Sequence, residues 1–143
     1  MICLGRGVLI AAAFAAILAS PRAFAEGALA IGSSGDIAKD GIAYGYSNDV
    51  EKADAAAEKA LAGCGGFKDA PKMAAICKLV TTFRNECIAV AQDFQNGTPG
   101  FAIAFGPTKA AAEERALALC RLTAGHDRMG ECKSDKSACD GVK

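Results

Sequence analysis

The chain has 143 residues, of which 52% are hydrophobic and 22% charged, and its basic and acidic residues are equal in number, at 16 each. This length suits one domain with a modest core. Balanced, interspersed charge supplies no basic face for nucleic acid and no polybasic segment for anionic lipid, so we expect neither as a partner. The chain is rich in alanine and has no tryptophan, which predicts a thin apolar core.

Residues 1–25 have the arrangement of a cleavable export signal. Arg6 precedes an apolar run from Val8 to Leu18, and Ala23-Phe24-Ala25 matches the small-x-small pattern of a cleavage site. The apolar run is shorter than the roughly 20 residues of a membrane-spanning helix. We therefore expect cleavage after Ala25 and release into the periplasm or the medium, with an uncleaved membrane anchor as the alternative.

Cleavage would leave residues 26–143 as a single disulfide-rich domain with no membrane span. Removing 25 of the 143 residues leaves 118, and the loss of Cys3 leaves six of the seven cysteines. The signal also carries Arg6 and Arg22 and no acidic residue, so the net charge falls from zero to −2. Six cysteines in a small exported chain indicate structural disulfides, which add the stability that a thin core lacks.

The first half of this domain, residues 26–84, begins with a predicted β-hairpin. Apolar runs at 28–31 and 42–44 are typical of short strands, and the segment 32–36 between them consists of glycine, serine and aspartate. Because so few residues separate the two runs, we expect the strands to pair antiparallel.

A helix and a third strand are predicted next. From about Asp49 to Gly63, apolar residues recur at helical spacing, with Asn48 as the expected N-cap. The residues expected on the inward face of this helix are Val50, Ala53, Ala57, Ala60, Leu61 and Cys64. Residues 77–83 are rich in β-branched and aromatic side chains, which favours a strand.

The second half, residues 85–143, repeats this order. Residues 87–91 and 101–105 are predicted strands on either side of a turn that contains Asn96-Gly97. Thr108 is the expected N-cap of a helix that runs to about Leu122. The residues expected to face inward from this helix are Ala112, Ala116, Leu117 and Cys120.

The last predicted segment, residues 132–139, occupies the place of the third strand but is polar. An edge strand and a stapled loop both tolerate such a sequence, and both readings stay open. The expected fold is α+β, with two β-β-α-β half-repeats forming an antiparallel sheet on which two helices pack.

The six remaining cysteines form a triplet in each half. Six cysteines allow 15 pairings, and spacing alone does not choose among them. If equivalent cysteines have equivalent partners, each helix end joins the strand that follows it and one bridge links the remaining two. The predicted pairs are Cys64–Cys77, Cys120–Cys132 and Cys87–Cys139. No two cysteines have the spacing of two to four residues that is typical of a zinc knuckle, and no Cys-x-x-Cys redox pair occurs, so we expect no metal site.

The sequence contains few candidates for catalysis. His126 beside Asp127 is a candidate general base, but a glycine-flanked polar loop is more typical of an exposed histidine. The carboxylates that fall in predicted loops are Asp36, Asp40, Asp49 and Asp93. Such groups serve in glycosidases, yet aspartate in turns usually bonds the local backbone. No phosphate-binding motif occurs, and we expect no cofactor.

Four hairpin aromatics are the remaining candidates for a binding surface. These are Tyr44, Tyr46, Phe101 and Phe105, which form a patch if the two hairpins lie side by side. Strand alternation instead places some of them in the core and some at the surface, and we expect most to be core.

These segments resemble a known family. The similarity rests on the strand 28–31, the helix end Ala60-Leu61-Ala62-Gly63-Cys64, the strand 87–91 and the second helix end Ala116-Leu117-Ala118-Leu119-Cys120. Together they resemble the small exported bacterial domain known as domain of unknown function 4189. The resemblance implies an exported bacterial protein and brings no established activity or functional residues.

Function is the least determined property of this sequence. We expect a non-enzymatic binding module of the bacterial envelope, with another protein as its partner, for example a secreted or wall-acting enzyme that it inhibits in the manner of an immunity protein. The alternative is a small envelope hydrolase that uses loop carboxylates or His126.

Overall fold

A computed structural model of the chain describes residues 26–141. The predicted export signal and its cleavage site lie outside the described residues. The described residues form two three-stranded antiparallel sheets, one from each half of the domain. This arrangement confirms the α+β class predicted from the sequence.

The first half contributes the sheet with strand order β2-β1-β3. Its strands are β1 (Glu26–Gly32), β2 (Ala43–Val50) and β3 (Lys78–Phe83). Its helices are α1 (Ile37–Asp40), α2 (Ala53–Gly65) and α3 (Pro71–Ala74). The two short helices, α1 and α3, lie in segments that the sequence indicated only as turns or connections.

The second half contributes the sheet with strand order β5-β4-β6, which matches the first. Its elements are β4 (Cys87–Gln92), β5 (Phe101–Gly106), α4 (Lys109–Ala124), the 3-10 helix η1 (Met129–Glu131) and β6 (Lys133–Cys139). The polar segment left open by the sequence is therefore a strand. It is tolerated because β6 lies at the edge of its sheet and pairs only with β4.

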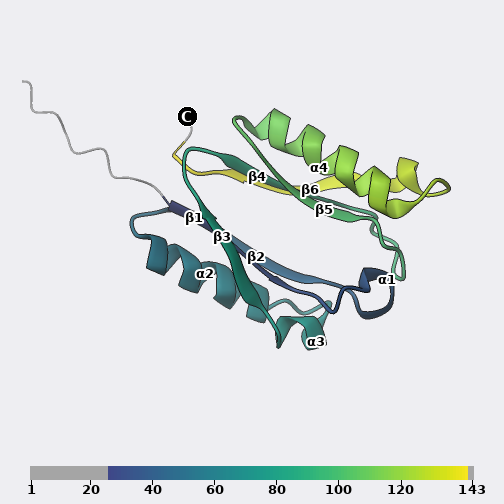
Figure 1. Cartoon of the computed structure of the whole chain (residues 1–143), viewed down its shortest axis with the longest axis horizontal. Helices are drawn as coiled ribbons and strands as arrows, with labels where there is room; N and C mark the ends of the chain where they lie inside the picture. Colours follow the sequence, from purple (N-terminus) through teal and green to yellow (C-terminus); the bar gives the residue numbers. More distant parts are fainter. Residues whose placement is uncertain (1–25, 142–143) are drawn as a thin grey trace, which may run out of the picture.

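The two sheets face each other, and one long helix covers the outer face of each, giving four layers (Figure 1). The sequence predicted a sheet with two helices on it, and the structure divides that sheet in two. The reason is that the central strands are apolar on both faces. The larger apolar side chains fill the layer between the sheets, where Leu29, Phe83 and Ile88 form one cluster and Tyr44, Val90 and Phe101 another.

The outer layers are built mainly from alanine and glycine. Ala28 and Ala30 of β1 pack on Ala56 and Ala60 of α2, and the second half repeats this with Ala89, Ala91, Ala112 and Ala116. A Cβ on Gly45 would lie 2.2 Å from the backbone nitrogen of Cys64, so only glycine permits this approach of α2 to β2. Small side chains bring helix and sheet close but bury little area. Because burial stabilises by about 25 cal/mol per Å² of apolar surface, these layers contribute little to stability.

The start of α2 was predicted wrongly. Strand β2 continues to Val50, so the helix begins at Ala53, which is exposed, and the buried positions are Ala56, Ala60 and Cys64. Asn48 does not cap it, because the helix begins too late in the chain. Its side-chain amide donates instead to Asp49 Oδ2 at 3.1 Å. Thr108 does cap α4, accepting from the backbone nitrogen of Ala111 at 3.2 Å.

Three disulfides join the cysteines of the described residues, and they are the pairs expected from the sequence. Cys64–Cys77 and Cys120–Cys132 tie the end of each long helix to the segment just before the following strand. Cys87–Cys139 links directly opposite residues of β4 and β6. Each half thus has its helix fixed covalently to its sheet.

Candidate functional site

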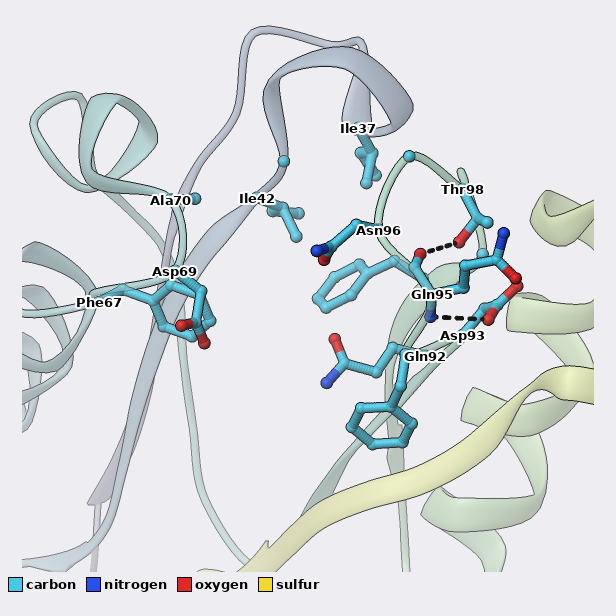
Figure 2. A pocket seen from close by; sticks show the side chains of 15 residues that line it. Ile37, Ile42, Phe67, Asp69, Ala70, Gln92, Asp93, Gln95, Asn96 and Thr98 are labelled. Carbon is cyan, nitrogen blue, oxygen red and sulfur yellow. Dashed lines mark hydrogen bonds between the residues drawn. The ribbon is translucent and has the colours of Figure 1, made fainter.

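A cleft of about 210 Å³ opens where the two halves meet (Figure 2). Ile37, Ile42, Phe67 and Asp69 of the first half line one wall. The other wall is the end of β4 and the loop that joins it to β5, residues 93–100. The cleft therefore exists only because the two sheets are stacked.

The loop 93–100 is fixed at its base by a buried ion pair. The Asp93 side chain is 2% exposed, and Arg128 binds it through two nitrogens, with Nη2 at 2.9 Å from Oδ1 and Nε at 2.5 Å from Oδ2. The Arg128 guanidinium, against the opposing effect of burial, lowers the pKa of Asp93 from 3.8 to about 2. Asp93 is therefore ionised at neutral pH, and it accepts hydrogen bonds from two nitrogens of Arg128 and from the backbone of Gln95.

Hydrogen bonds within the loop order it further. The backbone nitrogen of Gln95 donates to Asp93 Oδ1 at 3.0 Å, and the Thr98 hydroxyl donates to the Gln95 carbonyl at 2.9 Å. The backbone nitrogen of Asp93 donates to the Gly100 carbonyl at 2.8 Å and closes the base of the loop. Phe94 follows this anchor directly and is 58% exposed. The loop thus carries an exposed aromatic ring on an ordered backbone.

A tyrosine and two carboxylates lie beside the cleft. The Tyr44 hydroxyl donates to Asp135 Oδ2 at 2.7 Å, and Gln92 Nε2 donates to the same oxygen at 3.3 Å. Burial raises the pKa of Tyr44 well above its usual value, and Asp135 and Asp69 raise it further. Burial and Asp135 also raise the pKa of Tyr46. Asp135 thus lies within hydrogen-bond distance of side chains from both sheets.

The four hairpin aromatics lie in the layer between the sheets. Tyr44 and Phe101 are buried, with ring centroids 5.5 Å apart, while Tyr46 and Phe105 are half-buried. The ring centroids of Phe105 and Phe83 are 5.1 Å apart. The expectation that most are core residues is correct for Tyr44 and Phe101. Phe67, whose ring lies 5.0 Å from that of Tyr44, extends the cluster to the cleft.

The structure does not gather the carboxylates proposed for catalysis into one site. Asp36 accepts from the backbone nitrogen of Lys39 and caps α1, and Asp40 accepts from the Ser34 hydroxyl at 2.7 Å. Asp49 accepts from the backbone nitrogen of Gly141 at 3.1 Å. Each of these groups, like Asp93, has a structural hydrogen-bond partner, which is close in sequence for Asp36 and Asp40 and distant for Asp49.

His126 lies on the surface. Its side chain is 94% exposed, and its nearest charged partner is Asp127 Oδ1 at 3.6 Å from Nδ1, itself fully exposed. Within residues 26–141, no group of three or more His, Cys, Asp or Glu side chains is placed to hold a metal ion. None of the helices in the same range is long and apolar enough to cross a membrane.

One family model, described as a domain of unknown function, DUF4189, matches residues 27–139 of the chain. The chain belongs to this family. Neither the curated proteins nor the solved structures contain a match. The family assignment confirms the resemblance found in the sequence and brings no activity with it.

Sequence reasoning missed several residues that shape the cleft of this DUF4189 domain. Arg128 and Asp135 lie in polar segments, where a charged side chain is the norm and gives no signal of a partner. Phe67 and Asp69 lie in the connection after α2, which has no periodicity. The one available signal of a binding surface was Phe94, which is an apolar residue in a predicted turn and is flanked by residues with amide side chains.

Proposed function

We propose that this DUF4189 domain is an exported, non-enzymatic binding module that engages a protein partner through the loop 93–100 and the cleft beside it. An enzyme that the domain inhibits is the partner class we favour. The observation that carries the proposal is the exposed ring of Phe94 on a loop anchored by the Asp93–Arg128 ion pair.

An ordered loop supports binding because association normally costs about 0.5–1.5 kcal/mol for each mobile side chain that it immobilises. The hydrogen bonds of Asp93 and Thr98 already order the loop in the free protein, so binding has less ordering to supply. Aromatic residues contribute disproportionately to protein interfaces. The neighbouring Gln95 and Asn96 are exposed and add hydrogen-bonding groups to the same surface.

The state of the candidate acid and base groups supports a binding role over the alternative of a small hydrolase. A general acid or base works best with a pKa near the working pH. The pKa of Asp93 is about 2, and its oxygens are occupied by Arg128 and Gln95. His126 is exposed beside an exposed carboxylate, outside the cleft lining.

Three disulfides in a domain of this size support export, because disulfides persist in oxidising compartments. Mass spectrometry of the mature protein tests this. We expect a chain that begins at Glu26 and carries three disulfides. A cell-associated chain that retains residues 1–25 would instead support an uncleaved anchor.

Site-directed photocrosslinking tests the interaction. Phe94 is replaced by p-benzoylphenylalanine in the full chain, which is then irradiated in the cells that produce it. Leu122, 79% exposed on α4, carries the same probe as the matched control. We expect one discrete crosslinked protein from position 94 that is absent from position 122. Identical products from both positions, or no product from position 94, would contradict the proposal.

A further inference from the structure

The inter-half cleft has the chemistry of a site for a positively charged side chain. We propose that it receives an arginine or lysine side chain of the partner protein. This inference rests on the proposed function and adds the chemical class that the cleft recognises. Three properties of the cleft carry it: its charge, its aromatic and apolar walls, and its size.

The charge of the cleft favours a cation. Its lining contains the carboxylates Asp69 and Asp93 and no lysine, arginine or histidine. Arg128 neutralises Asp93, whereas Asp69 makes no hydrogen bond or ion pair within the described residues. An anionic ligand would therefore find no countercharge in the lining, and a cation would find Asp69.

A second carboxylate strengthens the negative field behind the cleft. Asp135 accepts from Tyr44 and from Gln92, and Gln92 is part of the cleft lining. Lys68 and Lys136 line a second hollow, of about 560 Å³, that shares only Phe67 and Asp69 with the cleft. Neither lysine lines the cleft itself.

The walls of the cleft fit the rest of a basic side chain. Phe67 lies on one wall and Phe94 on the other, and cations bind favourably over aromatic faces. Ile37 and Ile42 present aliphatic surface for the methylene stem. Figure 2 shows the side-chain amides of Gln92 and Asn96 pointing into the space between the walls, where their oxygens can accept hydrogen bonds from a guanidinium or ammonium.

The size of the cleft limits its occupant. Its volume of about 210 Å³ is below the roughly 300–1,000 Å³ of sites for whole small molecules. A single long side chain that enters from a partner surface is the occupant that this volume suits.

Binding of small probes to the intact domain tests the inference. The probes are N-acetyl-arginine methylamide, its uncharged counterpart N-acetyl-norleucine methylamide, and N-acetylglucosamine, each followed by backbone amide NMR shifts. We expect saturable shifts at Asp69, Gln92 and Asn96 with the arginine probe, weakened by added salt. The norleucine probe should bind about fivefold more weakly, the upper end of the ratio expected for loss of an exposed ion pair.

The variant Asp69→Asn is expected to weaken binding of the arginine probe by about fivefold. The control variant Asp54→Asn removes an exposed carboxylate of α2 and should leave the affinity for this probe unchanged. Both positions are exposed, so both variants should fold, and thermal unfolding checks this. Equal binding of the charged and neutral probes, saturation by the sugar alone, or no effect of Asp69→Asn would overturn the inference.

The two proposals fail in different ways. If the sugar or the neutral probe saturates the cleft while position 94 still crosslinks to a partner, the cationic class is wrong and the proposed function stands. If the arginine probe binds and position 94 captures nothing, the cleft chemistry stands and the protein-partner function is wrong.

Discussion

The two halves of the domain link equivalent pairs of strands through different interactions. In the second half, Cys87 of β4 and Cys139 of β6 are directly opposite and joined by a disulfide. In the first half, Gly27 of β1 pairs with Phe83, so Glu26 and Arg84 are the next opposite residues, and their side chains form an ion pair. One position in the fold therefore accepts either a covalent or an ionic link.

Irregularities in the strands show that these positions are equivalent. The register between β1 and β3 shifts between Leu29 and Ala30, three residues after Glu26. The register between β4 and β6 shifts between Val90 and Ala91, three residues after Cys87. The halves thus share a bulge as well as a strand order, and the difference in chemistry belongs to the sequence rather than to the backbone.

The largest effect is expected from removal of the cross-strand bridge. Replacing Cys87 and Cys139 with alanine should lower the free energy of unfolding by about 4 kcal/mol, because the bridge closes the longest of the three loops in the unfolded chain. Denaturant unfolding measures this. Replacing Cys64 and Cys77 should cost less, about 3 kcal/mol, for a shorter loop.

Peptide mapping without reduction is the control for this prediction. It should recover the three bridges intact in the wild-type protein. A peptide in which Cys64 is joined to Cys120 would show that the helix ends do not have the partners described above.

The second effect comes from copying the covalent link into the first half. The double variant Glu26→Cys, Arg84→Cys should stabilise the oxidised protein by about 2 kcal/mol, less than the loop-entropy value because the ion pair is lost and engineered bridges rarely reach that value. Unfolding of the oxidised and reduced forms measures the difference. If the oxidised variant is the less stable form, the two positions are not equivalent in geometry.

The third effect concerns the two hairpin loops. The second-half loop depends on the Asp93–Arg128 ion pair, whereas the first-half loop is held by exposed bonds such as that of Ser34 to Asp40. Because the folded-state pKa of Asp93 is below its ordinary value, its stabilising contribution is complete above about pH 4 and is lost as the pH falls toward 2.

Acid unfolding of Asp93→Asn measures this contribution. We expect the variant to be less stable than the wild type at neutral pH and the two to converge between pH 4 and pH 2. Asp36→Asn, in the first-half loop, is the matched control. An acid-unfolding curve of Asp93→Asn that stays parallel to the wild-type curve through this window would contradict the assigned role.

The smallest effect is expected at the two edge strands. β3 exposes Leu79 at 44% and Val80 at 57%, whereas β6 carries Asp135 at the bulge position that Val80 occupies in β3. Val80→Lys should change the free energy of unfolding by less than about 0.5 kcal/mol, since the side chain is exposed. It should raise the concentration at which the protein begins to associate, because a charged edge resists strand pairing.

Light scattering across a concentration series measures this association. The exposed position Thr82 of β3 provides a control, as Thr82→Ser alters the same edge without adding charge. Equal association of Val80→Lys and the wild type would show that the β3 edge is already protected.

Local patterns in the sequence predicted much of this fold. Alternation, helical spacing and turn residues placed most of the strands and both long helices, and Thr108 was identified as a cap. The prediction that Asn48 caps α2 was wrong, because β2 runs through a segment whose composition suits a helix start. The polar β6 could not be identified as a strand from its composition, because an edge strand needs no apolar face.

The candidate site was much less predictable. The sequence drew attention to His126 and to scattered loop aspartates, which the fold leaves exposed or hydrogen-bonded to structural partners. The cleft depends instead on Asp69 and Phe94, which are 25 positions apart in the numbering and come from different halves. No spacing rule connects such residues, because their proximity follows from how the two sheets stack.

The sequence by itself determined the order of the elements, the alanine faces of the helices and, through the repeated cysteine triplets, a single expected set of disulfide partners. These depend on local periodicity and on equivalence between the halves. Only the tertiary structure decided that the sheet divides in two, that an ion pair replaces a disulfide in the first half, and that a cleft containing Asp69 opens between the halves. Those features arise from contacts between residues far apart in the chain, whose pairing is decided by packing of the large apolar side chains between the sheets.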